Sequence, residues 1–300
     1  MTKEGKTLYL VDGSAMFYRA YYAFIRNPLI NSKGEDTSAT FGFVNSLLKI
    51  MNDEDPDYLA VVFDTREPTF RHKMYDEYKS TRAKMPGELA EQLPRIRQAI
   101  EVLNIPSFEL AGFEADDIIG TMAQDAEKAG FTIWCVTGDK DFYQLVNDNI
   151  GIYNPAAGSR PKGRSKAGSA LKMGREEVKA KFGVYPELII DKLALMGDSS
   201  DNVPGVIGIG PKTADKLLLQ FGSLEAVLTG YKEIKAKGLR ERIAANIDSA
   251  QLSRDLVTIN TNVPIEFEWK DIKCRPVDYE RTRALFLELE FTSLLKQLLP

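Results

Sequence analysis

The residues that are most clearly arranged for chemistry lie between positions 195 and 214. Asp198 and Asp201 are two carboxylates three residues apart, and the segment later opens a helix at Pro211, with Lys212 in the first turn. Proline favours the first helical position because its missing N–H would have no partner there. The turn between the acids and the helix contains three glycines, Gly205, Gly208 and Gly210.

This turn allows two interpretations. Glycines let the backbone approach a ligand closely, and a helix N-terminus directs free N–H groups at an anion. An acid pair followed by such an anion site is typical of metal-dependent chemistry beside a nucleic-acid backbone. The alternative is a glycine-rich turn between two helices, whose aspartates only cap those helices.

Further carboxylates follow the predicted strands. Apolar runs at 7–11, 58–63 and 131–137 predict buried strands, and 107–110 is a further candidate that precedes the entrance of a helix. The acids at these strand ends are Asp12, Asp64, Glu114, Asp116, Asp117, Asp139 and Asp141. Helix capping explains one or two of them. Because the carboxyl ends of parallel strands meet at one edge of an open α/β sheet, we expect the acids to lie close together.

So many carboxylates in one place favour divalent cations. Like charges within a few ångströms disfavour mutual ionisation unless cations lie between them. Mg²⁺ takes oxygen ligands and keeps several waters, and two such ions ~3.5–4 Å apart can clamp the attacking and leaving oxygens of phosphoryl transfer. The single histidine, His72, excludes a zinc site built from several histidines.

The segment between residues 65 and 86 mixes cationic and aromatic side chains. The cations include Arg71, Lys73, Lys79, Arg82 and Lys84, and the aromatic residues among them include Phe70, Tyr75 and Tyr78. Cations with aromatic rings between them are typical of a track for single-stranded nucleic acid. A solvated amphipathic segment is the alternative interpretation of the same composition.

Length and composition narrow the class of protein. The chain has 300 residues, of which 44% are hydrophobic and 27% charged, which suits a soluble globular protein of one large or two modest domains. Its net charge of −4 argues only weakly against nucleic acid, because acids gathered in a metal pocket are compatible with a basic groove elsewhere. Two distant cysteines, with no long apolar run and no signal peptide, predict a reduced, cytoplasmic protein that does not enter a membrane.

Six motifs follow one another along the chain. They are Val11-Asp-Gly-Ser14, Val62-Phe-Asp64, Glu77-Tyr-Lys-Ser-Thr-Arg82, Phe113-Glu-Ala-Asp-Asp117, Thr137-Gly-Asp-Lys-Asp-Phe142 and Gly197-Asp-Ser-Ser-Asp-Asn-Val-Pro-Gly205. Together they resemble the flap endonuclease family of structure-specific 5′ nucleases. The nearest resemblance is to the N-terminal 5′–3′ exonuclease domain of bacterial DNA polymerase I, and it runs from about residue 7 to 295.

The resemblance implies a particular architecture. The fold would be α/β, with a central, mostly parallel sheet flanked by helices, of the resolvase or PIN-like type. A helical arch would span about 66–103, and a helix–three-turn–helix DNA-binding motif would span about 188–222. The nuclease core would cover 1–185, and the helical region would cover 186–300.

The resemblance also implies roles for individual residues. The first-metal side would comprise Asp12, Asp64, Glu114, Asp116 and Asp117, and the second-metal side Asp139, Asp141, Asp198 and Asp201. Tyr78, Lys79 and Arg82 match arch residues that engage the scissile strand, and Arg19 and Arg71 lie where relatives keep phosphate-contacting arginines. The DNA-gripping turn would comprise Gly205, Gly208, Gly210, Lys212 and Thr213.

The implied activity is that of a 5′–3′ exonuclease and 5′ flap endonuclease, which hydrolyses DNA phosphodiesters by a two-metal-ion mechanism in flap and primer removal. The implied cofactors are two Mg²⁺ ions, replaceable by Mn²⁺, and a K⁺ at the helix–three-turn–helix turn. A monomer would bind DNA with a 5′ flap or a 5′ end next to a duplex, or an RNA primer strand. Whether the chain stands alone or is joined to a DNA polymerase stays open.

One segment departs from the family pattern. Residues 154–172 form a long stretch where a short connection is expected, and the stretch contains no acid. Its basic residues are Arg160, Lys162, Arg164, Lys166 and Lys172. We expect a flexible arm that reaches DNA phosphates by charge, chiefly through Lys162, Arg164 and Lys166. The alternative is an idle solvated loop.

Two other functions would use part of the same pattern. A phosphatase of the haloacid dehalogenase type also places an aspartate after its first strand. It expects a second aspartate two residues later, however, where this chain has Ser14. A non-catalytic DNA-binding module could use the turn at 205–212, but it would not require acids at four strand ends.

Overall fold

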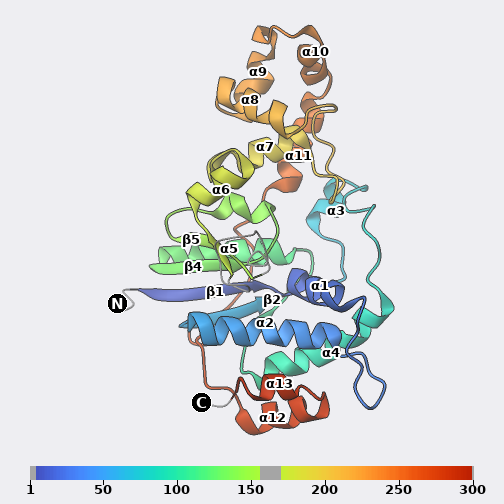
Figure 1. The fold of residues 1–300 in the computed structure, drawn as a ribbon. Coiled ribbons are helices and arrows are strands. Elements are labelled where there is room, and N and C mark those ends of the chain that lie inside the picture. The colour runs from blue at the N-terminus through green and yellow to red at the C-terminus, as the bar shows by residue number, and fades with distance from the viewer. Residues whose placement is uncertain (1–4, 156–169, 299–300) are drawn as a thin grey trace, which may run out of the picture.

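The computed structural model describes residues 5–155 and 170–298. Its centre is a six-stranded sheet in the order β3-β2-β1-β4-β5-β6 (Figure 1). The pair β5 and β6 is antiparallel, and the other neighbouring pairs are parallel. The strands are β1 Lys6–Asp12, β2 Tyr58–Val62, β3 Ser107–Phe108, β4 Phe131–Val136, β5 Ile150–Asn154 and β6 Leu171–Met173. The predicted mostly parallel sheet is therefore confirmed.

Helices flank the sheet and continue beyond it (Figure 1). The helices that precede β6 in the chain are α1 Gly13–Phe24, α2 Ser38–Glu54, α3 Phe70–Met74, α4 Gly87–Val102 and α5 Ala115–Lys128. Those after β6 are α6 Arg175–Phe182, α7 Ile189–Met196, α8 Pro211–Phe221, α9 Leu224–Gly230, α10 Lys237–Ala245, α11 Ile247–Val257, α12 Tyr279–Glu288 and α13 Thr292–Leu295. The short 3₁₀ helices are η1 Asp141–Leu145, η2 Pro186–Leu188 and η3 Tyr231–Glu233. None of the described helices combines the length and the apolar character needed to cross a lipid bilayer.

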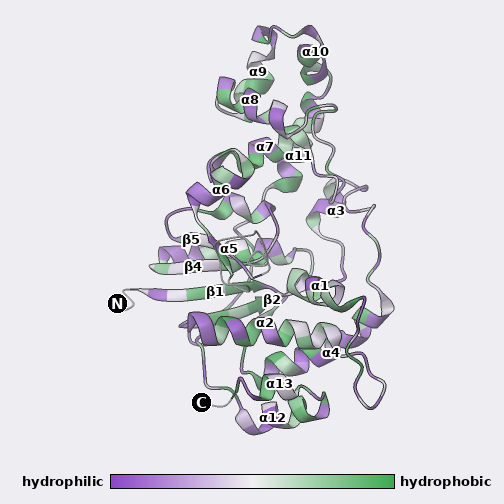
Figure 2. Ribbon diagram, viewed as in Figure 1, coloured by the Kyte–Doolittle hydropathy of each residue, from purple (hydrophilic) through white to green (hydrophobic). Residues whose placement is uncertain are grey.

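The alternation of side chains along β1 builds a core on both faces of the sheet. Leu8 and Leu10 pack with buried residues of α5 and α7 on one face. Tyr9 and Val11 pack with buried residues of α1, α2 and α4 on the other. Because both faces are covered, the central strands are almost continuously apolar, as parallel strands of α/β proteins usually are (Figure 2).

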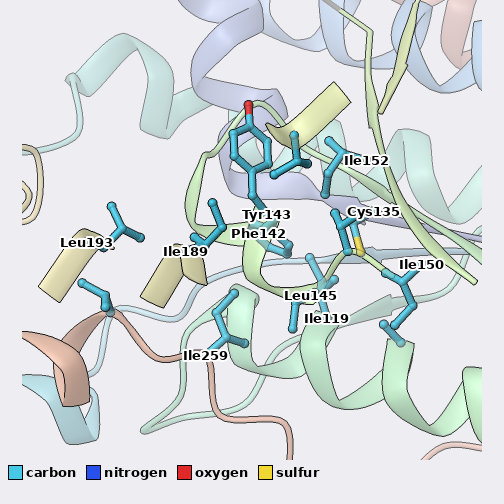
Figure 3. Packing of buried hydrophobic residues seen from close by; sticks show 14 of the residues in the cluster. Ile119, Cys135, Phe142, Tyr143, Leu145, Ile150, Ile152, Ile189, Leu193 and Ile259 are labelled. Atoms are coloured by element: carbon cyan, nitrogen blue, oxygen red, sulfur yellow. The ribbon is translucent and has the colours of Figure 1, made fainter. Parts of the chain in front are cut away.

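The core beneath η1 fixes the segment that follows β4 (Figure 3). Phe142 and Tyr143 of η1 are 0% and 2% exposed. They belong to one buried cluster with Cys135 of β4 and Ile189 of α7. Asp141, the first residue of η1, is therefore attached to a segment that the core holds in place.

After β6 the described elements are helices, and α8, α9 and α10 lie at the end of the molecule away from the sheet (Figure 1). Helices α7 and α11 pack against each other between this end and the sheet. The chain then returns to the sheet, where the Leu59 N–H donates to the Ile272 carbonyl at 3.0 Å. Finally, α12 packs against α4. The returning segment thus ties the helical region to β2.

The sequence patterns do not predict α1, β5 or β6. In β5 the pattern is weak because Gly151 interrupts it, and the structure shows why glycine stands there: a Cβ would lie 2.5 Å from the Trp134 ring. β6 takes Leu171 and Lys172 from the stretch that we expected to be a loop. The greater part of that stretch, including Lys162, Arg164 and Lys166, lies outside the described residues.

The segment expected to be a helical arch, 66–103, is helical only towards its two ends. α3 has five residues, and α4 has sixteen and packs against α2. Residues 75–86 between them are not helical. Their polar groups bond elsewhere, as the Lys79 N–H does in donating to the Asp201 carbonyl at 2.9 Å. This long-range bond, and local turn bonds such as that from the Tyr78 N–H to the Tyr75 carbonyl at 2.9 Å, take the place of a continuous helix here.

Candidate active site

β1 and β4 are neighbours in the sheet and bring their acids to one edge. Asp12 ends β1 and is 4% exposed. One of its carboxylate oxygens accepts from the Ala15 N–H at 2.9 Å, and the other accepts from the Thr137 hydroxyl at 3.0 Å. That hydroxyl oxygen in turn accepts from the Asp139 N–H at 3.1 Å. Thr137 therefore orients two predicted metal ligands, and its place at the end of β4 and at the start of a motif could have identified it.

Asp64 and Asp116 add charge at the same edge. Asp64 follows β2, and its carboxylate accepts from the Ala115 N–H at the start of α5, at 2.9 Å. Burial, followed by the nearby Asp64, raises the pKa of Asp12 to about 7. Burial, followed by Asp12 and Asp139, raises the pKa of Asp116 well above its ordinary value. Neighbouring acids thus oppose the ionisation of Asp12 and Asp116. We call Asp12, Asp64, Asp116 and Asp139 the first carboxylate group.

Asp141, Asp198 and Asp201 form the second carboxylate group, in which one oxygen from each residue lies within 4.8 Å of the others. Their side chains are 14%, 7% and 11% exposed. Burial, followed by the nearby Asp139, raises the pKa of Asp141 to about 7. The Oδ1 atom of Asp141 is buried and accepts no hydrogen bond. Hard carboxylate oxygens with an unsatisfied acceptor among them fit a divalent cation such as Mg²⁺.

A tight turn after α7 presents Asp198 and Asp201. The backbones of Asp198 and Val203 exchange two hydrogen bonds, of 2.9 and 2.8 Å. Gly197 and Gly205 have φ values of 71° and 61°, and a Cβ on Gly205 would lie 2.3 Å from the Gly197 nitrogen. The N–H and C=O of Gly205 are bonded within the chain. Gly205, which the sequence assigned to DNA contact, therefore closes the turn that holds the acids.

The rest of the glycine turn leads to the exposed start of α8. Gly210 is the residue before α8 and Pro211 its first position, as predicted. Gly208 has a φ of 79°, and its carbonyl accepts from Arg242 at 3.4 Å. Thr213 is half-buried, and its N–H donates to the Gly210 carbonyl at 3.0 Å. Lys212 is exposed and has no ion pair or hydrogen bond with the described residues, so its charge and the helix start are open to an anion.

Arg71 and Asp117 form a buried pair apart from both carboxylate groups. Two guanidinium nitrogens donate to the two Asp117 oxygens, each at 2.8 Å, and the remaining donors reach the carbonyls of Leu256 and Thr258 and, at 3.3 Å, a Glu114 oxygen. Arg71 is 2% and Asp117 0% exposed. Burial lowers the pKa of Arg71, but the bonded Asp117 carboxylate outweighs it, and the pKa is raised overall. Because the polar atoms of both side chains are already bonded within the protein, we leave Asp117 out of the proposed metal ligands and Arg71 out of the phosphate contacts.

Tyr78, Lys79 and Arg82, which we expected to engage a DNA strand, contact acids of the site. Lys79 Nζ lies 2.6 Å from Glu114 and 3.7 Å from Asp201. The Tyr78 hydroxyl lies 3.2 Å from a Glu114 oxygen and 3.3 Å from an Asp201 oxygen. Arg82 pairs with Asp201 as well, and half of its side chain remains exposed. This segment thus partly neutralises the site and closes over it.

Arg19 is a cation beside the first carboxylate group. It lines a pocket of about 300 Å³ together with Thr137, Gly138, Asp139 and Asn154. No hydrogen bond or ion pair joins the Arg19 side chain to the other described residues. Burial lowers its pKa, although Asp12 opposes that effect. An unpaired guanidinium beside the acids is suited to a phosphate group of a substrate.

Lys140 is a second residue that the sequence reasoning missed. Its Nζ lies 2.6 Å from Asp198 and 3.6 Å from Asp141. Burial lowers its pKa, but Asp141 and Asp198 outweigh burial, and the pKa is raised overall. Its position between Asp139 and Asp141 in the sequence was the available signal.

Two family models match successive parts of the chain. The 5′–3′ exonuclease N-terminal resolvase-like domain matches residues 7–183, and the 5′–3′ exonuclease C-terminal SAM fold matches residues 184–280. DNA polymerase I of Bacillus subtilis (strain 168) is 44% identical over 296 residues, which are 98% of this chain and 32% of that protein. The 5′–3′ exonuclease of Aquifex aeolicus (strain VF5) is 39% identical over 292 residues, which are 97% of this chain and 95% of that protein. The chain thus spans about a third of the length of the polymerase relative.

Solved structures share the fold. The T5 5′-exonuclease with bound divalent metal ions (zinc) has a TM-score of 0.69 at 19% identity, covering 98% of this chain and 99% of that chain. A T5 flap endonuclease in a complex with DNA and metal ions has a TM-score of 0.68 at 20% identity, covering 95% of this chain and 100% of that chain. With both family models matched in succession, the chain belongs to the 5′–3′ exonuclease family.

Proposed function

We propose that this chain hydrolyses DNA phosphodiesters at a 5′ flap, or at a 5′ end next to a duplex, with two divalent ions. The observation that supports this most directly is the second carboxylate group, with its buried and unsatisfied Asp141 oxygen, near Asp139 of the first group. Such a concentration of acids is unfavourable without cations. The exposed start of α8, which follows the turn that holds Asp198 and Asp201, adds a place for a DNA backbone.

Each carboxylate group would hold one ion. Asp12, Asp64, Asp116 and Asp139 would serve the first, and Asp141, Asp198 and Asp201 the second. Mg²⁺ is the proposed ion, and Mn²⁺, another hard divalent cation, would replace it. When bound, such a pair supplies activation of a water nucleophile and stabilisation of the leaving oxygen. Glu114 would orient Lys79, since their side chains are 2.6 Å apart.

The cationic residues around the acids would position the scissile strand. Lys79 would exchange Glu114 for the reacting phosphate, where added positive charge stabilises a more anionic transition state. Arg82 would leave Asp201 in the same way, because half of its side chain already faces solvent. Arg19 would bind a neighbouring phosphate from its pocket. Tyr78 would brace Glu114 and Asp201 from within the protein, since it is 4% exposed.

The finer assignments of partner and cofactor belong to this proposal as well. A monomer would act on flaps, on 5′ ends and on RNA primer strands in DNA replication and repair, in the cytoplasm of a bacterium. A K⁺ would bind at the turn that precedes α8. The basic stretch 154–172 would add contacts to DNA phosphates.

Lys212 is expected to contribute to DNA binding and not to catalysis. Lys212→Ala should weaken binding to flap DNA and reduce the slope of log affinity against log salt by about one unit, because one phosphate contact is lost. Fluorescence anisotropy at several salt concentrations measures this slope. Lys128→Ala removes an exposed lysine of α5 that pairs with Asp125, and it serves as the control that should leave the slope unchanged.

The complementary variant is Lys79→Ala. It should lower the single-turnover rate at saturating DNA with only a modest loss of affinity, because its charge acts at the reacting phosphate. The opposite pattern is that Lys212→Ala slows the saturated rate and Lys79→Ala flattens the salt slope. It would contradict the assignment of Lys212 to DNA binding and of Lys79 to catalysis.

A substrate comparison tests the proposed function against its rivals. The chain is incubated with 5′-labelled flap DNA and Mg²⁺, and in parallel with a small phosphomonoester. We expect cleavage of the flap DNA and none of the phosphomonoester. Hydrolysis of the phosphomonoester would favour a phosphatase, although the structure offers Ser14 at the expected aspartate position, with its hydroxyl oxygen accepting from the Asp64 N–H at 2.9 Å. Binding without cleavage would indicate a DNA-binding module.

A further inference from the structure

Lys140 places a fixed positive charge at the second carboxylate group. Its Nζ lies 2.6 Å from an oxygen of Asp198 and 3.6 Å from the Asp141 oxygen that accepts no hydrogen bond. These two aspartates, with Asp201, converge within 4.8 Å. The ammonium group therefore contacts the same two carboxylates that a divalent ion in this group would use.

Other cations near the site contact different acids. Lys79 bonds to Glu114, and Arg82 pairs with Asp201. Lys140 is the cation that reaches both Asp141 and Asp198 among the described residues. A lysine ammonium is a compact point charge on a flexible four-carbon stem, and 30% of this side chain is exposed. It can therefore leave the carboxylates for solvent without rearrangement of the core.

We propose that Lys140 is an internal cation that competes with the divalent ion of the second carboxylate group, and so sets the ion concentration at which that group is filled. This inference rests on the proposed two-ion function. In the ion-free protein the ammonium relieves the repulsion between Asp141 and Asp198. When an ion binds, the contact of Lys140 with Asp198 is weakened, because a divalent cation and an ammonium group within a few ångströms of each other repel. Lys140 is thus a positioning residue that weakens the second site.

The test is the affinity of the DNA-free protein for Mn²⁺, measured by titration calorimetry at about pH 8, where ordinary carboxylates are ionised. Lys140→Met keeps the length of the side chain and removes its charge. We expect the weaker of two Mn²⁺ sites to bind about tenfold more tightly in this variant, because a strong charge-assisted hydrogen bond no longer has to be broken. The other site should change much less. Unchanged or weaker binding at this site in a folded variant would overturn the proposal.

Two control variants separate charge at this position from charge in general. Lys140→Arg keeps the positive charge and should keep the affinity near that of the parent protein. Lys128→Met removes an exposed lysine of α5 and should change neither site. A wild-type protein that binds only one Mn²⁺ would overturn the two-ion function, and the competition with it. Two ions with no effect of Lys140→Met would overturn the competition alone.

A measurement on the unaltered side chain keeps the proposal testable if Lys140→Met fails to fold. In protein labelled with ¹⁵N-lysine, the Lys140 ammonium resonance is identified by its absence from Lys140→Arg. During a titration with Mg²⁺ it should move as the weaker site fills, when Lys140 leaves Asp198. A resonance that does not move at ion concentrations that fill both sites would overturn the proposal.

Discussion

Asp139→Asn is expected to lower the single-turnover rate of flap cleavage in Mg²⁺ by about 10³-fold or more. A bound divalent ion contributes several kcal/mol of transition-state stabilisation, and each ~1.4 kcal/mol corresponds to a factor of ten. Asparagine keeps an oxygen for the Asp141 N–H, which donates to Asp139 at 2.9 Å. The local backbone should therefore survive while the charge is lost. Quenched-flow cleavage of 5′-labelled flap DNA at saturating enzyme measures the effect.

Two controls show whether the loss comes from ion binding. Asp125→Asn changes an exposed aspartate of α5 that pairs with Lys128, and its rate should equal that of the parent protein. The ion-free melting temperature of Asp139→Asn should be unchanged or higher, because one member of a mutually repelling group has become neutral. A rate within tenfold of the parent protein, with melting unchanged, would contradict the role of Asp139 as an ion ligand.

Arg71→Met is expected to lower the free energy of unfolding by about 3–5 kcal/mol, the usual effect of breaking a buried ion pair. The variant leaves Asp117 charged at 0% exposure, without the two 2.8 Å bonds that hold it. Urea denaturation measures the change. In Arg82→Met the arginine that is lost is half exposed, and the change should stay below about 1 kcal/mol.

A double variant isolates the buried charge as the cause. Arg71→Met with Asp117→Asn should recover part of the lost stability, because asparagine is neutral and still offers an oxygen to the Asn260 N–H. At a temperature where Arg71→Met remains folded, its salt slope for DNA binding should equal that of the parent protein. A reduced slope, or a single variant as stable as the parent, would restore Arg71 to the phosphate-contacting residues.

The sequence was sufficient to predict that acids gather at one edge of the sheet. Asp12, Asp64 and Asp139 each follow a short apolar run, and parallel strands must end at the same edge, so local pattern and topology agree. Pro211 likewise marked the start of α8. The division of the acids into two groups came from the family resemblance, which placed Asp139 on the second-metal side and not with Asp12.

Side-chain direction could not be predicted in the same way. Asp116 and Asp117 are adjacent, but successive residues of a helix point about 100° apart. Which of them faces the sheet edge depends on how α5 packs against Asn260 and its neighbours, a contact distant in sequence. The ion pair of Arg71 could not be predicted either, because its partner Asp117 lies 46 residues away in the sequence. The role of Gly205 is set by its close approach to Gly197, which composition does not reveal. Composition alone therefore suggested a ligand contact.

Anomalous diffraction from crystals of the DNA-free chain soaked in Mn²⁺ tests the central claim most directly, because it locates the ions themselves. The account predicts one peak at the first carboxylate group and one at Asp141, Asp198 and Asp201, with Lys140 moved away from Asp198 and no peak at Asp117. A crystal at saturating Mn²⁺ without a peak at the second carboxylate group would contradict it.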